Sequence, residues 1–373
     1  MKFRPMSFSY SPPESLKEIR SIAQPRVSFN LGLTGICFYT AELVRLSPEG
    51  KARATLADTA KRLLAAAARE SKRPGAFTFD PELGAELGRE ELTAGVFTGL
   101  AGLGYVETLL GATLADATLS SAGVARIERA YRAHCALAEP PGELFMGTAG
   151  YIALCTDLGA RGIESASLSQ IEGDAAVRLS ASHRRRSAPA SLGGAHGVTG
   201  ELIALLLAPR ALPARSLKAR LDELLKLATV DGDYIAWPTH RGGHVPPPMW
   251  ASFCNGVVGQ TILYARAFSV FGEERYRLAA TRGARTCFDL GGANATLCCG
   301  AAGAVTALFY AARALEDPRY KRRSQRRLAA LVERRSGERS HVFLQGDLGT
   351  SWLELLRAHR EPLHFPFLRG LYA

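Results

Sequence analysis

Three cysteines stand where a Gly-x-x-Gly turn leads into an apolar helix. Cys298 and Cys299 come directly before Gly300, and Cys254 lies two positions before Gly256. Cys254 and Cys298 therefore occupy the same place in two related motifs. If these motifs are equivalent parts of neighbouring repeats, the three thiols converge on one point. Three thiolates suit Zn²⁺, which takes three protein ligands and one exchangeable position in catalytic sites. The sequence therefore predicts a zinc site with an open position.

The motif that carries these cysteines is repeated along the chain. A Gly-x-x-Gly pair followed by an apolar segment of helical length occurs seven times, at steps of 67, 48, 50, 59, 44 and 46 residues. Seven copies at this spacing indicate a repeat architecture. The first glycines of the seven pairs are Gly32, Gly99, Gly147, Gly197, Gly256, Gly300 and Gly346.

Two kinds of helical segment alternate in this repeat. The segments after the glycine pairs are apolar nearly all round, as buried helices are. Charged, amphipathic segments lie between them, at residues 56–70, 121–137, 167–182, 216–229, 274–290 and 318–333. Such helix pairs cannot bury a face alone, so they must stack on one another.

The inner segments decide how the pairs stack. Because they are apolar on every side, they favour a closed ring over an open solenoid. We predict an all-α fold, an α/α toroid (barrel) of seven inner and seven outer helices with every Gly-x-x-Gly turn at one end. We expect the glycines to allow positive φ and close backbone approach at that end. Residues 1–28 are interpreted as an N-terminal extension or first outer helix, and 29–373 as one domain.

If all the turns share one end, the two residues before each first glycine surround a common mouth. The chemically active types are concentrated in the fourth, fifth and sixth repeats, which are neighbours on the ring. The seven pairs are Asn30/Leu31, Phe97/Thr98, Phe145/Met146, Ala195/His196, Cys254/Asn255, Cys298/Cys299 and Leu344/Gln345. Glycosidases and terpene enzymes also use toroids, but they need paired carboxylates or an Asp-rich motif, which these positions lack.

His196 is the best candidate for a general acid or base at this mouth, because imidazole titrates near neutral pH. Its alternative is a structural turn histidine, and the alternative for the three cysteines is that they are small buried residues. His240 and His244 lie in the loop before Cys254 and are interpreted as solvated. The four remaining cysteines fall inside helical segments and are assigned to the core: Cys37, Cys135, Cys155 and Cys287.

Composition limits the remaining functions. The 373 residues are 47% hydrophobic and carry a formal net charge of +11. A basic protein attracts acidic partners, although an Arg-rich composition alone explains this charge equally well. Because no nucleic-acid-binding motif accompanies the charge, nucleic acid is not an expected partner. No signal peptide or membrane-spanning segment is recognised, so a cytoplasmic protein with reduced thiols is expected.

Several motifs together resemble the lanthionine synthetase C-like cyclases. They are the seven glycine pairs, Ala195-His196-Gly197, Trp237-Pro238, the Cys-x-Gly and Cys-Cys-Gly turns, and the closing run at 362–367. The resemblance extends from Phe29 nearly to the C-terminus. It implies an α/α toroid with zinc at the mouth that adds a peptide Cys thiol to dehydroalanine or dehydrobutyrine, which forms a thioether ring.

The resemblance also implies site residues. Cys254, Cys298 and Cys299 would be the zinc ligands, with Cys299 in place of the His of the usual family triad, as in a subset of cyclases similar to class II lanthipeptide synthetases. His196 would be the acid or base, oriented by Glu143 where many cyclases have Asp.

Three positions depart from the family pattern. Asn255 stands where an aromatic residue or His is common, and it is retained here as a catalytic candidate. Phe253 replaces a Trp, and Trp250 stands where an Arg is common. Arg241 is a candidate substitute for that Arg.

Three hypotheses follow for the function. The first is a zinc-dependent peptide cyclase that forms lanthionine and methyllanthionine in a ribosomal precursor peptide. Dehydration would come from a separate dehydratase, or the chain is an excised domain of a larger protein. An acidic leader on the precursor would suit the basic protein, with Arg184, Arg185 and Arg186 as a contact or simply a solvated charge run. The alternatives are a zinc-bearing scaffold without activity and an enzyme that adds glutathione.

Overall fold

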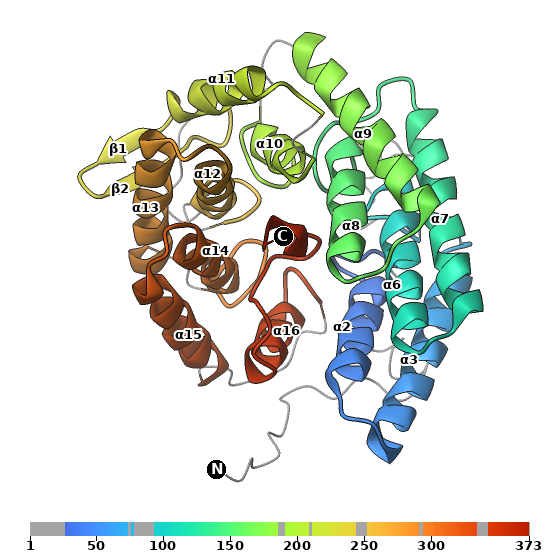
Figure 1. Ribbon diagram of the computed structural model, residues 1–373. Helices are drawn as coiled ribbons and strands as arrows, with labels where there is room; N and C mark the ends of the chain where they lie inside the picture. The colour runs from blue at the N-terminus through green and yellow to red at the C-terminus, as the bar shows by residue number, and fades with distance from the viewer. Residues whose placement is uncertain are drawn as a thin grey trace.

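The computed structural model describes residues 27–73, 76–77, 93–185, 191–208, 211–243, 252–290, 294–333 and 342–372. Within these residues seven inner helices surround the centre of the molecule, and outer helices flank them (Figure 1). The inner helices are α2 (Leu33–Leu46), α6 (Leu100–Thr113), α8 (Thr148–Ala160), α10 (Val198–Leu207), α12 (Val257–Phe271), α14 (Ala301–Ala314) and α16 (Asp347–Ala358).

Six outer helices lie within the described residues. They are α3 (Lys51–Glu70), α7 (Ala117–Cys135), α9 (Ala166–Arg185), α11 (Ala214–Leu225), α13 (Glu274–Asp289) and α15 (Pro318–Glu333). The predicted all-α toroid is confirmed. The seventh outer helix expected within 1–28 lies almost wholly outside the described residues. None of the described helices combines the length and hydrophobicity needed to cross a lipid bilayer.

One element differs from the prediction. Helix α11 ends at Leu225, and the chain then forms an antiparallel ribbon of β1 (Thr229–Asp231) and β2 (Tyr234–Ala236). The β-branched Val230 and Ile235 pair across this ribbon. Trp237 follows it and is buried, with its indole N–H donated to the Leu224 carbonyl at 3.0 Å. The ribbon therefore closes the end of α11.

The two helix types bury their surfaces as their sequences require. On outer helix α11 the buried residues are Leu217, Leu221 and Leu224, which form one stripe at helical spacing. Every residue of inner helix α10 is buried, because it has other helices on all sides. The ring is thus a two-layer structure with its core between and inside the layers.

The seven turns before the inner helices are joined by a closed circuit of main-chain hydrogen bonds, at 2.7 to 3.4 Å. This circuit places all seven turns at one end of the ring, as predicted, and it satisfies buried backbone groups that no helix or sheet would satisfy. The bonds run from Asn30 N to Phe97 O, Phe97 N to Phe145 O, Leu144 N to Ala195 O, Ala195 N to Cys254 O, Phe253 N to Cys298 O, Cys298 N to Leu344 O, and Leu344 N to Asn30 O.

The glycine pairs allow close approach of the backbone, and they do not adopt positive φ. The first glycine of each pair is the helix N-cap, with φ between −106° and −144°, so the positive-φ half of the prediction is wrong. The second glycine lies against its own turn. A Cβ on Gly35 or Gly303 would lie 2.5 Å from the carbonyl oxygen of Phe29 or Leu297, respectively. Only glycine permits this contact.

The C-terminal segment after α16 fills the centre of the ring (Figure 1). His364, Phe365 and Phe367 are completely or almost completely buried there. The Arg369 amide donates to Asp157 Oδ1 at 3.0 Å, and Arg161 joins Asp157 to Glu42 of α2 through ion pairs of 2.7 and 2.9 Å. This buried network ties the segment to the inner helices.

Candidate metal centre

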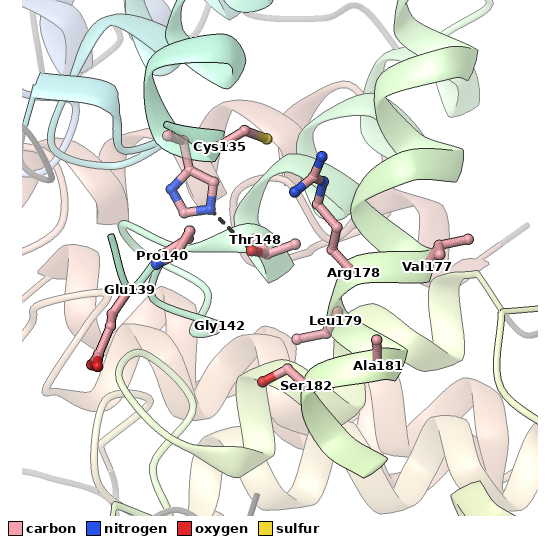
Figure 2. Close-up of a pocket in the computed structure, with 11 residues that line it drawn as sticks. Cys135, Glu139, Pro140, Gly142, Thr148, Val177, Arg178, Leu179, Ala181 and Ser182 are labelled. Atoms are coloured by element: carbon pink, nitrogen blue, oxygen red, sulfur yellow. Dashed lines mark hydrogen bonds between the residues drawn. The ribbon is translucent and has the colours of Figure 1, made fainter. Parts of the chain in front are cut away.

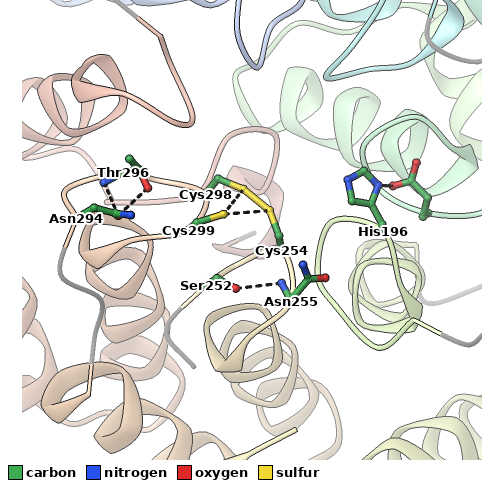
Figure 3. The surroundings of a disulfide bond; sticks show 9 residues. His196, Ser252, Cys254, Asn255, Asn294, Thr296, Cys298 and Cys299 are labelled. Atoms are coloured by element: carbon green, nitrogen blue, oxygen red, sulfur yellow. Dashed lines mark hydrogen bonds and ion pairs between the residues drawn. A yellow bond between two sulfur atoms is a disulfide. The ribbon is translucent and has the colours of Figure 1, made fainter. Parts of the chain in front are cut away.

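The three cysteines of the predicted zinc site are brought together. Cys254 lies on the turn before α12, and Cys298 and Cys299 lie on the turn before α14 (Figure 3). All three Sγ atoms lie within 4.8 Å of one another. Cys299 Sγ is 3.5 Å from Cys298 Sγ and 3.9 Å from Cys254 Sγ.

Main-chain bonds hold these two turns in register. The Phe253 amide donates to the Cys298 carbonyl at 2.7 Å, and the Cys298 amide donates to the Leu344 carbonyl at 2.9 Å. Cys254 and Cys298 are buried, whereas Cys299 is half-buried. The cluster therefore has one side that a further ligand can approach.

Cys254 and Cys298 are joined by a disulfide in this structure. The sequence predicts free thiols at these positions, so this pairing differs from that expectation. Metal ligation requires thiolates. The cluster can therefore hold an ion only when this pair is reduced.

The donor set fits zinc in the reduced state. Zn–S bonds of about 2.3 Å in a tetrahedral site place two sulfurs about 3.8 Å apart, and the two distances from Cys299 bracket that value. Burial raises the pKa of the Cys299 thiol. This thiol accordingly stays protonated near neutral pH unless a cation binds beside it. Within the described segments, these cysteines are the one group of three or more His, Cys, Asp or Glu residues suited to a metal ion.

His196, the predicted acid or base, lies on the turn before α10 and contacts Glu143. Its Nδ1 is 3.3 Å from Glu143 Oε2, and 48% of the His196 side chain is exposed. Burial lowers the pKa of His196, but the hydrogen bond and negative charge of Glu143 outweigh it, so the net pKa lies above its ordinary value. The carboxylate therefore favours the imidazolium and leaves Nε2 to face a substrate.

Glu143 is itself held by the backbone of its turn. Its two carboxylate oxygens accept hydrogen bonds from the amides of Phe145 at 2.7 Å and Met146 at 2.6 Å. Ser28 and Ser252 accept equivalent bonds from the residues three positions later. These serines also stand four residues before a first glycine. Glu143 occupies the same position before Gly147. This repeated capping position could identify Glu143 from the sequence, and its longer side chain extends to His196.

The histidine turn lies directly against the first cysteine. The Gly194 amide donates to the Phe253 carbonyl at 3.1 Å, and the Ala195 amide donates to the Cys254 carbonyl at 3.4 Å. A Cβ on Gly193 would overlap the carbonyl oxygen of Cys254. The turn that carries His196 is thus packed against the backbone of a cysteine of the cluster, and Figure 3 shows both.

Asn255 lies on the turn that carries Cys254 and is half-buried against the histidine turn. Its main-chain amide donates to Ser252 Oγ at 3.1 Å, and its side-chain Oδ1 lies beside Gly193. The structure thus brings Asn255 to the cysteine and histidine turns.

Other residues named from the sequence lie elsewhere. His240 is exposed and contacts the Thr239 hydroxyl at 3.0 Å, and Arg241 is exposed beside it. The main chain of His240 pairs with Ser191, and among the described residues no hydrogen bond or ion pair joins His240 or Arg241 to the cysteines. His244, Trp250 and the side chains of Arg184, Arg185 and Arg186 lie outside what the structure describes.

Aromatic residues support the site, and the sequence revealed only part of this support. Phe145 packs its ring edge against His196 at 5.2 Å between centroids, and Phe365 stacks on Phe253 at 3.7 Å. Phe145 lies two positions before Gly147, a first glycine, so the sequence predicts its place at the mouth. Phe365 comes from the C-terminal segment, and nothing in its local pattern places it below the cysteines.

Comparison with known proteins agrees with this architecture. The model of the lanthionine synthetase C-like protein family matches residues 26–353. Among solved structures, nisin cyclase is similar, with a TM-score of 0.68 and 13% sequence identity over 95% of this chain and 94% of that chain. At that identity the likeness shows the fold alone. Because the family model covers most of the sequence, this chain belongs to the lanthionine synthetase C-like family.

Proposed function

We propose that the protein is a zinc-dependent peptide cyclase. It adds Cys thiols of a ribosomal precursor peptide to dehydroalanine or dehydrobutyrine, which forms lanthionine or methyllanthionine. The observation that carries this proposal is the placement of three cysteine sulfurs beside a turn that bears a carboxylate-paired histidine. Family membership supports the same reaction class.

The cysteine cluster prepares the nucleophile. Bound at the three sulfurs, Zn²⁺ would lower the pKa of a substrate thiol in its open position, so that the thiol is a thiolate at neutral pH. Cys254 and Cys298 are rigidly held in the backbone circuit, and Cys299 is the half-exposed member. The turns thus orient the incoming sulfur toward the mouth.

His196 supplies the proton that completes the addition. The substrate sulfur forms a bond to the β-carbon of the dehydroamino acid, and the π electrons move toward the neighbouring carbonyl to give an enolate. The α-carbon then takes a proton from the His196 imidazolium, and His196 regains a proton from solvent in place of the one that the substrate thiol released there. The net change is addition of S–H across the double bond. Glu143 keeps His196 protonated and oriented.

Asn255 is proposed to stabilise the enolate by donating its side-chain N–H groups to the enolate oxygen. Its position on the turn that carries Cys254, against the histidine turn, supports this role.

The partners follow from the reaction. A precursor peptide is the substrate, and a separate dehydratase supplies the dehydroamino acids. The formal net charge of +11 favours a peptide with an acidic leader.

The test is cyclisation of a dehydrated precursor peptide encoded beside the gene. Because the addition conserves mass, conversion is scored as loss of peptide thiols that an alkylating reagent can label. We expect thiol loss with the reduced, zinc-loaded protein, abolition in Cys299→Ala, and unchanged activity in Cys287→Ala, a buried cysteine on α13 outside the site. Undiminished thiols with every neighbouring precursor, zinc being bound, would refute the cyclase and favour a scaffold.

A further inference from the structure

A cavity of about 490 Å³ lies behind the turn that carries Glu143. It is lined by the C-terminal ends of outer helices α7 and α9 and by the turn between α7 and α8 (Figure 2). Both outer helices lead into turns of the backbone circuit, so the cavity is at the same end of the ring as the cysteine cluster. We call it the α7–α9 cavity.

His134 in the wall of this cavity has an acceptor atom without a partner. The Thr148 hydroxyl is 3.3 Å from the Pro141 carbonyl and 2.9 Å from His134 Nε2, and we assign the ring proton to Nε2 because this tautomer makes both hydrogen bonds. In this tautomer Nδ1 is a bare acceptor that is buried and has no hydrogen-bond partner within the part of the chain that the structure describes. Burial, assisted by the charge of Arg178, lowers the pKa of His134 to about 4, so the ring is neutral. A buried acceptor of this kind is costly until a donor reaches it.

The rest of the lining combines hydrogen-bonding groups with an apolar wall. Ser182 and Arg178 offer donors, and Glu139 offers a carboxylate. Val177 and Leu179 line the same cavity, and Val177 is 60% exposed. Arg178 is already paired with Asp174 at 2.7 Å, so the cavity is not built for a free anion. Donors and acceptors beside an apolar wall suit a peptide backbone with an apolar side chain.

One turn separates the cavity from the proposed reaction site. Gly142 lines the cavity, and the next residue, Glu143, contacts His196. An extended peptide advances about 3.3 to 3.6 Å per residue. A substrate held at His196 therefore crosses this turn within a few residues of its reacting position.

We propose that the α7–α9 cavity is a subsite for a segment of the precursor peptide that flanks the ring-forming residues. A donor group of the peptide supplies the hydrogen bond that His134 Nδ1 lacks, and an apolar side chain lies against Val177 and Leu179. This subsite deepens the proposed cyclase function and rests on it.

Cys135 provides a direct test of occupancy. It lines the cavity and is half-buried, whereas Cys37, Cys155 and Cys287 are fully buried. Iodoacetamide labelling of Cys135 at mildly alkaline pH is followed by peptide mapping, with and without a dehydrated precursor whose cysteines are replaced by serine. Because this precursor has no cysteines, it neither reacts with iodoacetamide nor binds through sulfur. We expect it to slow labelling of Cys135 about tenfold at saturation.

Two matched variants of α9 test the contribution to catalysis. Ser182→Trp fills the cavity, and Ser169→Trp places the same side chain at an exposed position on the same helix. We expect Ser182→Trp to raise KM about tenfold with kcat nearly unchanged and to abolish the protection of Cys135. Ser169→Trp should behave as wild type.

The outcomes separate the two proposals. Protection of Cys135 without cyclisation would support the subsite and refute the cyclase. Cyclisation with unprotected Cys135 would refute the subsite alone. If Ser182→Trp fails to fold, the labelling of Cys135 in the wild-type protein still decides whether the precursor occupies the cavity.

Discussion

Phe365 stacks on Phe253 with their ring centroids 3.7 Å apart and their planes within 13° of each other. Phe253 directly precedes Cys254, and its amide donates to the carbonyl of Cys298. The C-terminal segment therefore forms the floor on which the cysteine turns rest. A residue distant in sequence thus supports the geometry of the three sulfurs.

Replacing Phe365 should weaken metal binding as well as the fold. Phe365→Leu is compared with Phe367→Leu. Phe367 is a buried residue of the same segment that packs on Phe29 and Phe97. Each substitution should destabilise the protein by about 1 to 2 kcal/mol in urea titration. Only Phe365→Leu should also lower zinc affinity in a chelator competition. Equal zinc affinity in the two variants would show that the stack does not position the cysteines.

The pairing of Glu143 with His196 predicts a pH effect on cyclisation. His196 donates a proton, so the rate should fall as pH rises through its raised pKa. Glu143→Gln removes the charge that raises this pKa but retains an oxygen for the backbone amides. The alkaline limb of kcat/KM should accordingly move to lower pH. His196→Asn should reduce kcat by about 10² to 10⁴. If the alkaline limb does not move in Glu143→Gln, the limb does not report a pKa of His196 that Glu143 raises.

The disulfide between Cys254 and Cys298 predicts that metal uptake depends on reduction. Oxidised protein should show two fewer titratable thiols when unfolded without reductant, and it should take up no zinc at the cluster. Reduction should restore both. Zinc bound with equal affinity by the oxidised protein would place the metal elsewhere.

The second glycine of a pair should not tolerate a side chain. Gly303→Ala places a Cβ 2.5 Å from the Leu297 carbonyl oxygen, whereas Gly173→Ala on α9 meets nothing within 4 Å. We expect Gly303→Ala to lower the free energy of unfolding by about 1 to 3 kcal/mol and Gly173→Ala to raise it by about 0.5 to 1 kcal/mol. If Gly303→Ala leaves the free energy of unfolding unchanged, close backbone approach is not the reason for the motif.

The repeat made much of the fold predictable. Seven glycine pairs with buried helices after them determined the ring, and the equivalence of Cys254 and Cys298 placed both on neighbouring turns. The close approach of the second glycines was predicted, but the extended φ of the first glycines was not, because both conformations suit glycine. The ribbon at Thr229–Asp231 and Tyr234–Ala236 was also missed, since its residues lie next to a helical pattern.

The support of the site was less predictable for a physical reason. The stack of Phe365 on Phe253 joins segments more than 100 residues apart, and no periodicity encodes such a contact. The oxidation state of Cys254 and Cys298 depends on the environment and not on their spacing.

Metal analysis of the reduced protein tests the central claim most directly. The wild-type protein should hold about one zinc per chain, bound through three cysteine sulfurs and visible as such by X-ray absorption. Cys299→Ala should lose this zinc, and the matched variant Cys287→Ala should keep it. Absence of tightly bound zinc in the reduced wild-type protein, or its full retention in Cys299→Ala, would contradict the account.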